Sequence, residues 1–454
     1  MLPRNPKLFN ALGNLLLLSC CSCLLLIPAF INGYPIVNPD TGTYICSGFL
    51  FEIPIDRPIT YGLLIRLFSF NGATLWTVII AQAFIVSMLI TMIIRHYFKG
   101  RQYYIISILT IAALTTMTSL SWVVCELIAD VFTTIGLLTV ICLFICKTNK
   151  IEKGLLYLLL FAAICTHMSH AIIFIALVVI LLIFGRQLFD KADRNSAIKK
   201  TSIITCICLA SLVVVSPTSS KSKHAFLMAT FLQKGVLKKY LDDKCPTVHY
   251  KLCKYKDELL DDPNWFLWHF TSPFIKEGDW DGTKAEYTTI NNDILTHMPY
   301  NTMFIEQSIP YTLQQLVSYK IGDGNGAFDS TSNIAAAIGM YISSNEYTQF
   351  ISSTQNTQSL TPDKLCIPNT IIMGIVIISI IGIVLLFILG NMKLAYSTKR
   401  LLFICFTGIV INCWDCATFA QVNGRYGCRV MWLLPFCFLL MLFQKKFNSS
   451  PRHE

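Results

Sequence analysis

An aspartate that follows the first apolar segment is the first residue whose type and place could do chemistry. Asp40 lies in the stretch Gly33–Tyr44, directly after that segment, so it would sit near a membrane interface. A carboxylate kept from full solvation can act as a general base or bind a cation. The alternative is that Asp40 caps the helix that follows Pro39.

Three further acidic residues have neighbours that suggest a role. Asp56 precedes Arg57 in a turn bracketed by two prolines. Arg57 could clamp a phosphate in a bidentate manner or simply pair with Asp56. Glu126 and Asp130 are four residues apart, which places both carboxylates on one face of a helix. Because carboxylates rarely face lipid, this pair is expected to hold a cation, orient an acceptor, or form hydrogen bonds inside a helical bundle.

Basic residues are scarce on the side of the membrane that we predict to be exported, so each one there suggests an anionic partner. Lys221, Lys223 and His224 form one cluster, for which a lipid phosphate and plain solvent are the alternatives. Arg425 and Arg429 share one short turn. They are expected to meet either a bound phosphate or an acid of the preceding segment.

Histidine and cysteine pairs offer fewer possibilities. His167 and His170 are three residues apart, which permits a shared metal, but two histidines are too few for a zinc site. Phosphate binding and simple interfacial placement are the other interpretations. Cys245 and Cys253 lie eight residues apart in a region predicted to be exported, where a disulfide can form.

The elements that position these residues are apolar helices. Of 454 residues, 54% are hydrophobic and only 14% are charged, whereas soluble domains average about 25% charged residues. This composition excludes an ordinary soluble enzyme, a coiled coil and a disordered chain, and predicts an all-α polytopic membrane protein. Ten spans are expected, at about 8–32, 74–94, 103–121, 124–146, 154–169, 171–185, 201–216, 369–390, 401–420 and 430–443.

The distribution of charge predicts the topology. Most basic residues outside 217–368 cluster in connectors that fall on one side, so the positive-inside rule places this side and both termini in the cytoplasm. The chain then divides into a bundle of seven helices (1–216) with an exported catalytic loop (33–73), a mostly helical exported domain (217–368), and three C-terminal helices with a short cytoplasmic tail (369–454).

The net charge of +10 does not indicate a nucleic-acid partner. Residues 217–368 contain 13 Lys, no Arg and 16 acidic residues, so the excess of positive charge lies in the connectors that set the topology. The exported loops contain no N-glycosylation sequon, which favours a bacterial inner membrane with 217–368 in the periplasm.

Together these residues resemble the GT-C glycosyltransferases, a superfamily that includes the protein O-mannosyltransferases and the aminoarabinose transferases of lipid A. The similarity covers about the first 185 residues and the last helices, and the exported segment resembles uncharacterised bacterial membrane proteins. The motifs that carry it are Asp40 with Tyr44 four residues later, the stretch Asp56-Arg57-Pro58-x-x-Tyr61, the acids near the fourth span, and Arg425-Tyr426.

The resemblance implies a GT-C-like bundle of helices and an inverting enzyme. The enzyme would move a sugar from a polyprenyl-phosphate donor to a glycan, lipid or protein acceptor at the exported face of the membrane. Asp40 would be the base that activates the acceptor hydroxyl. The acceptor, or a divalent cation such as Mg or Mn, would be positioned by Glu126, Asp130, Tyr44 and Asp56. The donor phosphate would be bound by Arg57, Lys221, Lys223, His224, Arg425 and Arg429. Further candidates are His167, His170, Tyr61 and Tyr426. No second acidic pair follows the third span, so the need for a metal stays open.

Other functions fit parts of the pattern. An O-antigen ligase or polymerase would use exported arginines and histidines without needing Asp40. A transporter or flippase for lipid-linked glycans usually shows internal repeats and charges at the membrane midplane, whereas these charges gather at one outer mouth. An assembly scaffold would use 217–368 to bind a partner.

Overall fold

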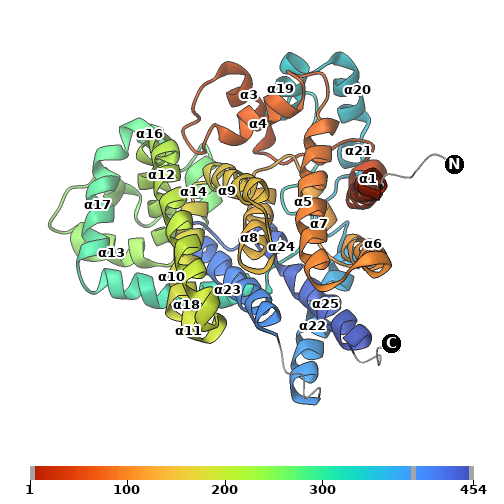
Figure 1. Cartoon of the computed structure of the whole chain (residues 1–454). Coiled ribbons are helices and arrows are strands. Elements are labelled where there is room, and N and C mark those ends of the chain that lie inside the picture. The colour runs from red at the N-terminus through yellow and green to blue at the C-terminus, as the bar shows by residue number, and fades with distance from the viewer. Residues whose placement is uncertain (1–5, 390–394, 449–454) are drawn as a thin grey trace.

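The computed structural model describes residues 6–389 and 395–448, and these residues fold almost entirely into helices (Figure 1). The described residues contain no strand, only one isolated parallel bridge between Ile36 and Glu126. The predicted all-α class is therefore confirmed. The predicted cytoplasmic tail beyond residue 448 lies outside the described residues.

The N-terminal part consists of apolar helices joined by short turns. A helix satisfies its backbone hydrogen bonds internally, as a bilayer requires. Gly33 ends the second helix with a φ of +77°, in the left-handed region that glycine adopts without strain, and so turns the chain toward Asp40. The helices are α1 (Pro6–Leu25), α2 (Ile27–Asn32), α3 (Thr41–Leu50), α4 (Thr60–Phe68), α5 (Trp76–Tyr97), α6 (Gly100–Met117), α7 (Leu120–Cys125), α8 (Val131–Ile145), α9 (Lys150–Cys165), α10 (His170–Ile183) and α11 (Gly185–Leu188).

The next helix, α12 (Lys191–Gln233), runs without interruption for 43 residues. At 1.5 Å per residue it is about 64 Å long, twice the roughly 30 Å thickness of a bilayer core. The predicted boundary between bundle and exported domain, at 216/217, therefore falls inside a helix. Because helical hydrogen bonds are satisfied within the chain, α12 can pass from apolar to polar surroundings without a break.

The segment 217–368 is shared between two apolar cores. Buried residues between Ala225 and Phe304 form one core, whereas those between Ile321 and Phe350 pack into the core of the apolar bundle. Polarity alone did not show this division, because it does not say against which neighbours a residue packs. The helices are α13 (Val236–Lys244), the 3-10 helix η1 (Lys251–Tyr255), α14 (Pro263–Trp268), α15 (Pro273–Lys276), α16 (Asp279–Gly282), α17 (Lys284–Thr296), α18 (Tyr300–Val317), α19 (Asn333–Tyr341), α20 (Ser344–Ser352) and α21 (Thr354–Gln358).

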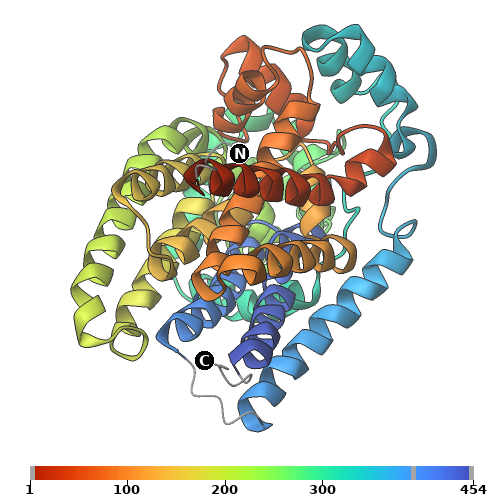
Figure 2. The same cartoon turned by 45° about the vertical axis from the view of Figure 1, so that its right-hand side comes forward.

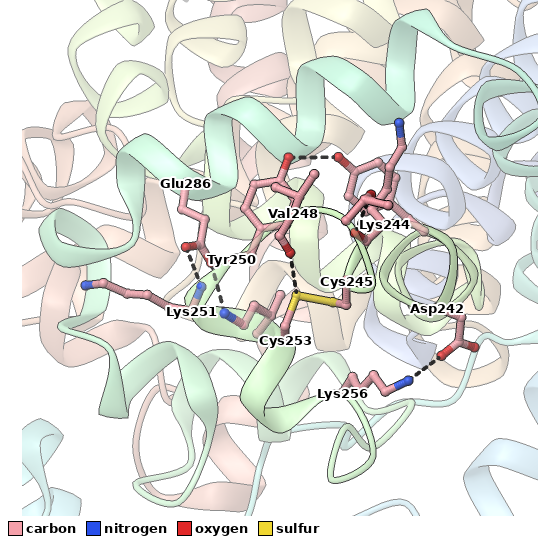
Figure 3. Close-up of a disulfide and its surroundings, with 12 residues drawn as sticks. Asp242, Lys244, Cys245, Val248, Tyr250, Lys251, Cys253, Lys256 and Glu286 are labelled. Carbon is pink, nitrogen blue, oxygen red and sulfur yellow. Dashed lines mark hydrogen bonds and ion pairs between the residues drawn. A yellow bond between two sulfur atoms is a disulfide. The ribbon is translucent and has the colours of Figure 1, made fainter.

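A disulfide closes a short loop beside α17. It joins Cys245 and Cys253, the pair that the sequence indicates, and Figure 3 shows the loop between them against the helix. Glu286 of α17 accepts hydrogen bonds from the backbone N–H groups of Lys251 (2.8 Å) and Leu252 (3.0 Å). The loop is thus fixed both covalently and by α17.

The chain ends in α22 (Cys366–Leu389), α23 (Tyr396–Phe419), α24 (Gly424–Met431) and α25 (Leu433–Asn448), with α22 at the edge of the bundle (Figure 2). Each of the ten predicted spans contains a helix. By length and composition, five described stretches are long and apolar enough to cross a membrane: Trp76–Tyr97, Lys191–Thr218, Cys366–Ile388, Tyr396–Phe419 and Gly424–Phe447. Shorter apolar helices cover Ala11–Leu25, Val131–Ile145 and His170–Ile183.

Candidate active site

The loop that carries Asp40 is fixed against the turn between α7 and α8. The N–H of Ile36 donates to the carbonyl of Cys125 (3.0 Å), and the N–H of Leu127 donates to the carbonyl of Ile36 (2.8 Å). The hydroxyl of Thr41 donates to the carbonyl of Leu127 (2.9 Å). These contacts bring Asp40 to the turn that contains the predicted acid pair.

Six charged side chains from separate parts of the chain form one row in which acids and bases alternate. Arg57 Nη1 lies 2.9 Å from Asp40 Oδ1, and Arg57 also pairs with its neighbour Asp56. Arg425 bridges two acids, because its Nη1 lies 3.3 Å from Asp40 Oδ2 and its Nε lies 3.0 Å from Asp130 Oδ2. Arg429 Nη1 completes the row at 2.7 Å from Asp130 Oδ1. We call this row the ion-paired cluster, and its order is Asp56, Arg57, Asp40, Arg425, Asp130 and Arg429.

Neither central acid of the cluster caps the helix that follows it. Asp40 stands at the N-cap position of α3 and Asp130 at that of α8, but neither side chain accepts a capping hydrogen bond. Both carboxylates contact guanidinium groups instead. The capping interpretation of Asp40 is therefore wrong for this structure.

The start of α24 positions the two late arginines differently. The side-chain oxygen of Asn423 caps the helix by accepting the N–H of Arg425 (2.9 Å). Arg425 is partly exposed and donates to Asn38 Oδ1 (2.9 Å). Arg429, one turn later, is fully buried and donates to Asn412 Oδ1 (2.9 Å). A ligand from outside can therefore reach Arg425 but not Arg429.

Asp40 is the most exposed carboxylate of the cluster. Its side chain is 27% exposed, against 3% for Asp130. Burial raises the pKa of Asp40, but the guanidinium groups of Arg57 and Arg425 outweigh this effect, so that the pKa lies below its ordinary value. Asp40 is therefore ionised at neutral pH, as a base must be, and accessible to a hydroxyl group.

Aromatic rings support the arginines of the cluster. The Arg57 guanidinium lies 5.2 Å from the centroid of the Tyr44 ring, and that of Arg425 lies 5.1 Å from the centroid of Tyr426. Such contacts stabilise a cation. Tyr61 meets the Tyr44 ring edge-on at 4.9 Å. Tyr44 and Tyr426 therefore touch the cluster, and Tyr61 holds Tyr44 in place.

Glu126 lies beside the ion-paired cluster and not within it. Its carboxylate accepts a hydrogen bond from Trp122 Nε1 (3.1 Å) and lines a small pocket with Lys320 and Arg425. The prediction that Glu126 and Asp130 share one helix face is wrong, because α7 ends before Glu126 and α8 begins after Asp130. The bridge to Ile36 uses the backbone groups that a continuous helix would need.

The two candidate histidines have local partners. The Nδ1–H group of His170 donates to the carbonyl of Ala163 (2.7 Å), so Nε2 accepts from the hydroxyl of Thr133 (2.8 Å). Both ring nitrogens of His170 are thus used inside the bundle. His167 Nδ1 lies 2.9 Å from the hydroxyl of Ser169, and its ring lies 5.1 Å from that of His170. The pair therefore offers no metal site.

Helix α12 touches the ion-paired cluster at Thr218, whose hydroxyl donates to the carbonyl of Arg57 (3.2 Å), one turn before its candidate basic residues. Lys221 and Lys223 are exposed, and within the described part of the chain neither forms an ion pair. His224 is buried, with its ring 6.5 Å from Trp280 and 6.4 Å from Tyr287, in the core of the 225–304 region. His224 is therefore enclosed, whereas the expectation that Lys221 and Lys223 bind a phosphate stays a prediction.

The residues near Asp40 do not fit a divalent cation. In residues 6–389 and 395–448, no three His, Cys, Asp or Glu side chains converge closely enough to hold a metal ion. Asp40 and Asp130 are each paired with two arginines, whose positive charge opposes a cation.

A glycine-rich loop of the 217–368 segment completes the site, and the sequence analysis did not identify it. Gly324 has a φ of +82°, and a Cβ atom there would lie 2.7 Å from Asn38 Nδ2. Asn325 donates to the backbone carbonyl that precedes Asn38 (3.0 Å). Asp323 accepts a hydrogen bond from the backbone N–H at the start of α24 (3.0 Å). The only sequence signal was the glycine at every second position from 322 to 326.

The chain has a likeness to a solved structure but matches no family model. No curated protein matches it either. Among solved structures, the chain is similar to ArnT from Cupriavidus metallidurans in the apo state, with 12% identity and a TM-score of 0.33 over 96% of this chain and 78% of that chain. A likeness at this level transfers no residue roles to this chain.

Proposed function

We propose that this chain is a glycosyltransferase of the bacterial inner membrane. It moves a sugar from a polyprenyl-phosphate donor to a hydroxyl acceptor on the exported face, with Asp40 as the general base. The observation that carries the proposal is the placement of one accessible carboxylate between two guanidinium groups, those of Arg57 and Arg425. This arrangement provides a base and an anion-binding pair within one site.

The proposed reaction is a single displacement. The acceptor oxygen attacks the anomeric carbon of the sugar while Asp40 takes the hydroxyl proton. The bond between the anomeric carbon and the phosphate oxygen breaks, and polyprenyl phosphate leaves with the bonding electron pair. Arg57 and Arg425 stabilise the negative charge that develops on this phosphate. One displacement inverts the configuration at the anomeric carbon.

The same two arginines also explain how Asp40 can become a stronger base. Before the donor binds, each oxygen of the Asp40 carboxylate contacts one guanidinium group. A donor phosphate competes for these cations, because arginine binds phosphate with charge-assisted hydrogen bonds. As the cations turn toward the phosphate, the carboxylate gains affinity for the acceptor proton.

Other cluster residues have supporting roles in this proposal. Asp130, which is buried and held by Arg429, fixes the Nε side of Arg425. The Nη groups of Arg425 are then left for Asp40 and the donor. Glu126 is buried and accepts a hydrogen bond from Trp122, so it is not proposed to touch the acceptor. His224 and Arg429 are not proposed as donor ligands.

The test is Asp40→Asn in the purified full chain, with sugar transfer and binding of polyprenyl phosphate measured separately in proteoliposomes. Asparagine keeps the shape but cannot take the proton, so transfer should fall by about 10²- to 10⁴-fold, while binding persists. Asp257→Asn is the matched control, because Asp257 is an exposed aspartate of the 217–368 segment outside the ion-paired cluster. Transfer by Asp40→Asn at the wild-type rate would show that Asp40 is not the base, as expected for a ligase.

A further inference from the structure

Helix α18 presents an apolar face outward although it belongs to the segment that the sequence predicts to be exported. Ile305, Ile309, Leu313 and Val317 are 61% to 75% exposed. Residues spaced by four lie along one side of a helix, so the four side chains form a continuous outward stripe. Glu306 is the only charged residue of α18.

The inward side of α18 is more polar than this stripe at two positions. Ser308 and Gln315 are buried on the inward side, together with Tyr300 and Phe304 in the first half of the helix. Gln315 donates to the carbonyl of Asn423 (2.9 Å) and accepts the N–H of the same residue (2.8 Å). A helix at the surface of a soluble domain shows the reverse pattern, with apolar residues inside and polar residues outside. The stripe is therefore ill-suited to water.

The neighbour of α18 indicates what covers the stripe. α18 packs along α23, which is long and apolar enough to cross a membrane. α23 has its own exposed apolar residues with the same spacing of four, namely Phe406, Val410 and Trp414. Outward apolar residues beside a candidate membrane span are accommodated best by the lipid that would surround that span.

We propose that the outward stripe of α18 is immersed in the lipid of the membrane leaflet on the side of the ion-paired cluster. α18 is not among the five described stretches able to cross a membrane, so it lies in the interface as an amphipathic helix. Its last turn reaches Asn423, the cap of the helix that carries Arg425. The membrane surface thus extends to the edge of the ion-paired cluster. This inference does not depend on the proposed reaction.

The experiment is a nitroxide accessibility scan of the full chain reconstituted in liposomes. A nitroxide is attached through an azide-bearing noncanonical residue, because the chain contains sixteen free cysteines. It is placed in turn at Ile305, Ile309, Leu313 and Val317. Collision with oxygen, which concentrates in lipid, is compared with collision with a water-soluble nickel chelate. If one variant does not fold, the remaining positions of the stripe still carry the test.

Two sets of control positions define the accessibilities expected in lipid and in water. Ile377 and Ile381 are exposed on α22, a candidate span, and are expected to report lipid. Asn292 and Thr296 are exposed polar residues of α17 and are expected to report water. We expect the stripe to resemble α22. Preferential collision with the nickel chelate, as at α17, would show that the stripe faces water. Shielding from both reagents would show a second copy or another protein on it, and either result overturns the proposal.

Discussion

Arg425 and Arg429 stand one helical turn apart, and the structure predicts opposite consequences from replacing each by lysine. Arg425 is partly exposed and contacts Asp40, the proposed base, at 3.3 Å. Arg429 is fully buried, where it donates to Asp130, to Asn412 and to the sulfur of Cys416. Lysine keeps the charge but cannot reproduce the planar fork of arginine.

For Arg425→Lys, the expected loss is one charge-assisted hydrogen bond to the donor phosphate. Such a bond contributes about 1.5–3 kcal/mol, which corresponds to roughly 10- to 100-fold weaker binding. The fold should be little affected, because Asp130 keeps its buried partner Arg429. For Arg429→Lys, the charge remains but the buried Asn412 loses its donor, which costs about 1–3 kcal/mol of stability, while the folded fraction should bind phosphate as before.

The assay measures binding of polyprenyl phosphate and thermal unfolding for both variants in the same detergent. The prediction is a double dissociation, in which Arg425→Lys loses affinity and Arg429→Lys loses stability. Unchanged affinity in Arg425→Lys, together with weakened binding by a normally stable Arg429→Lys, would refute the assignment of the two roles.

Two further predictions concern the base and its loop. Burial raises the pKa of Asp40, but its arginine partners outweigh burial and lower it, so kcat/KM should fall on the acid side only below the ordinary range of an aspartate. Arg57→Gln removes one cation beside Asp40, so the pH below which kcat/KM falls should move upward. If that pH does not change, the fall in kcat/KM does not report the protonation of Asp40. Gly324→Ala should slow transfer, because the added Cβ would lie 2.7 Å from Asn38 Nδ2 at a φ of +82°. Gly326→Ala, with open space around it, is the control, and equal rates for the two alanine variants would contradict this reasoning.

Much of the architecture could be predicted from the sequence because it depends on local composition. Apolar runs of sufficient length form helices in any membrane context, and each of the ten predicted spans contains one. The end of the bundle could not be predicted in the same way. The charge pattern changes at Pro217, but α12 continues to Gln233, because a change in polarity does not break a helix.

The central residues of the site could be predicted because they break the charge pattern. Arg57, Arg425 and Asp130 are charged residues on the predicted exported side, where the chain otherwise carries few. In the structure, Arg57 and Arg425 contact Asp40, and Asp130 contacts Arg425. Lys221 broke the pattern as well, but within the described residues it forms no ion pair with the cluster. Charge alone does not tell which exceptional residues meet.

The neutral parts of the site gave no comparable signal. Asn38 contacts Arg425, which lies far away in the sequence, and an asparagine in a loop is unremarkable by type. The loop around Gly324 lies in a polar segment where glycine and asparagine are common. Only tertiary packing places Asn325 beside the Asp40 loop.

Binding of a polyprenyl phosphate by Arg57 and Arg425 can be measured directly by photocrosslinking. A polyprenyl phosphate with a diazirine in its first isoprene unit is irradiated with the full chain in liposomes, and the labelled peptides are identified by mass spectrometry. We predict adducts in the 33–73 loop and in the peptide that contains α24, both lost in the double variant Arg57→Ala, Arg425→Ala. Adducts confined to other segments, or equally strong in the double variant, would contradict a phosphate site at the ion-paired cluster.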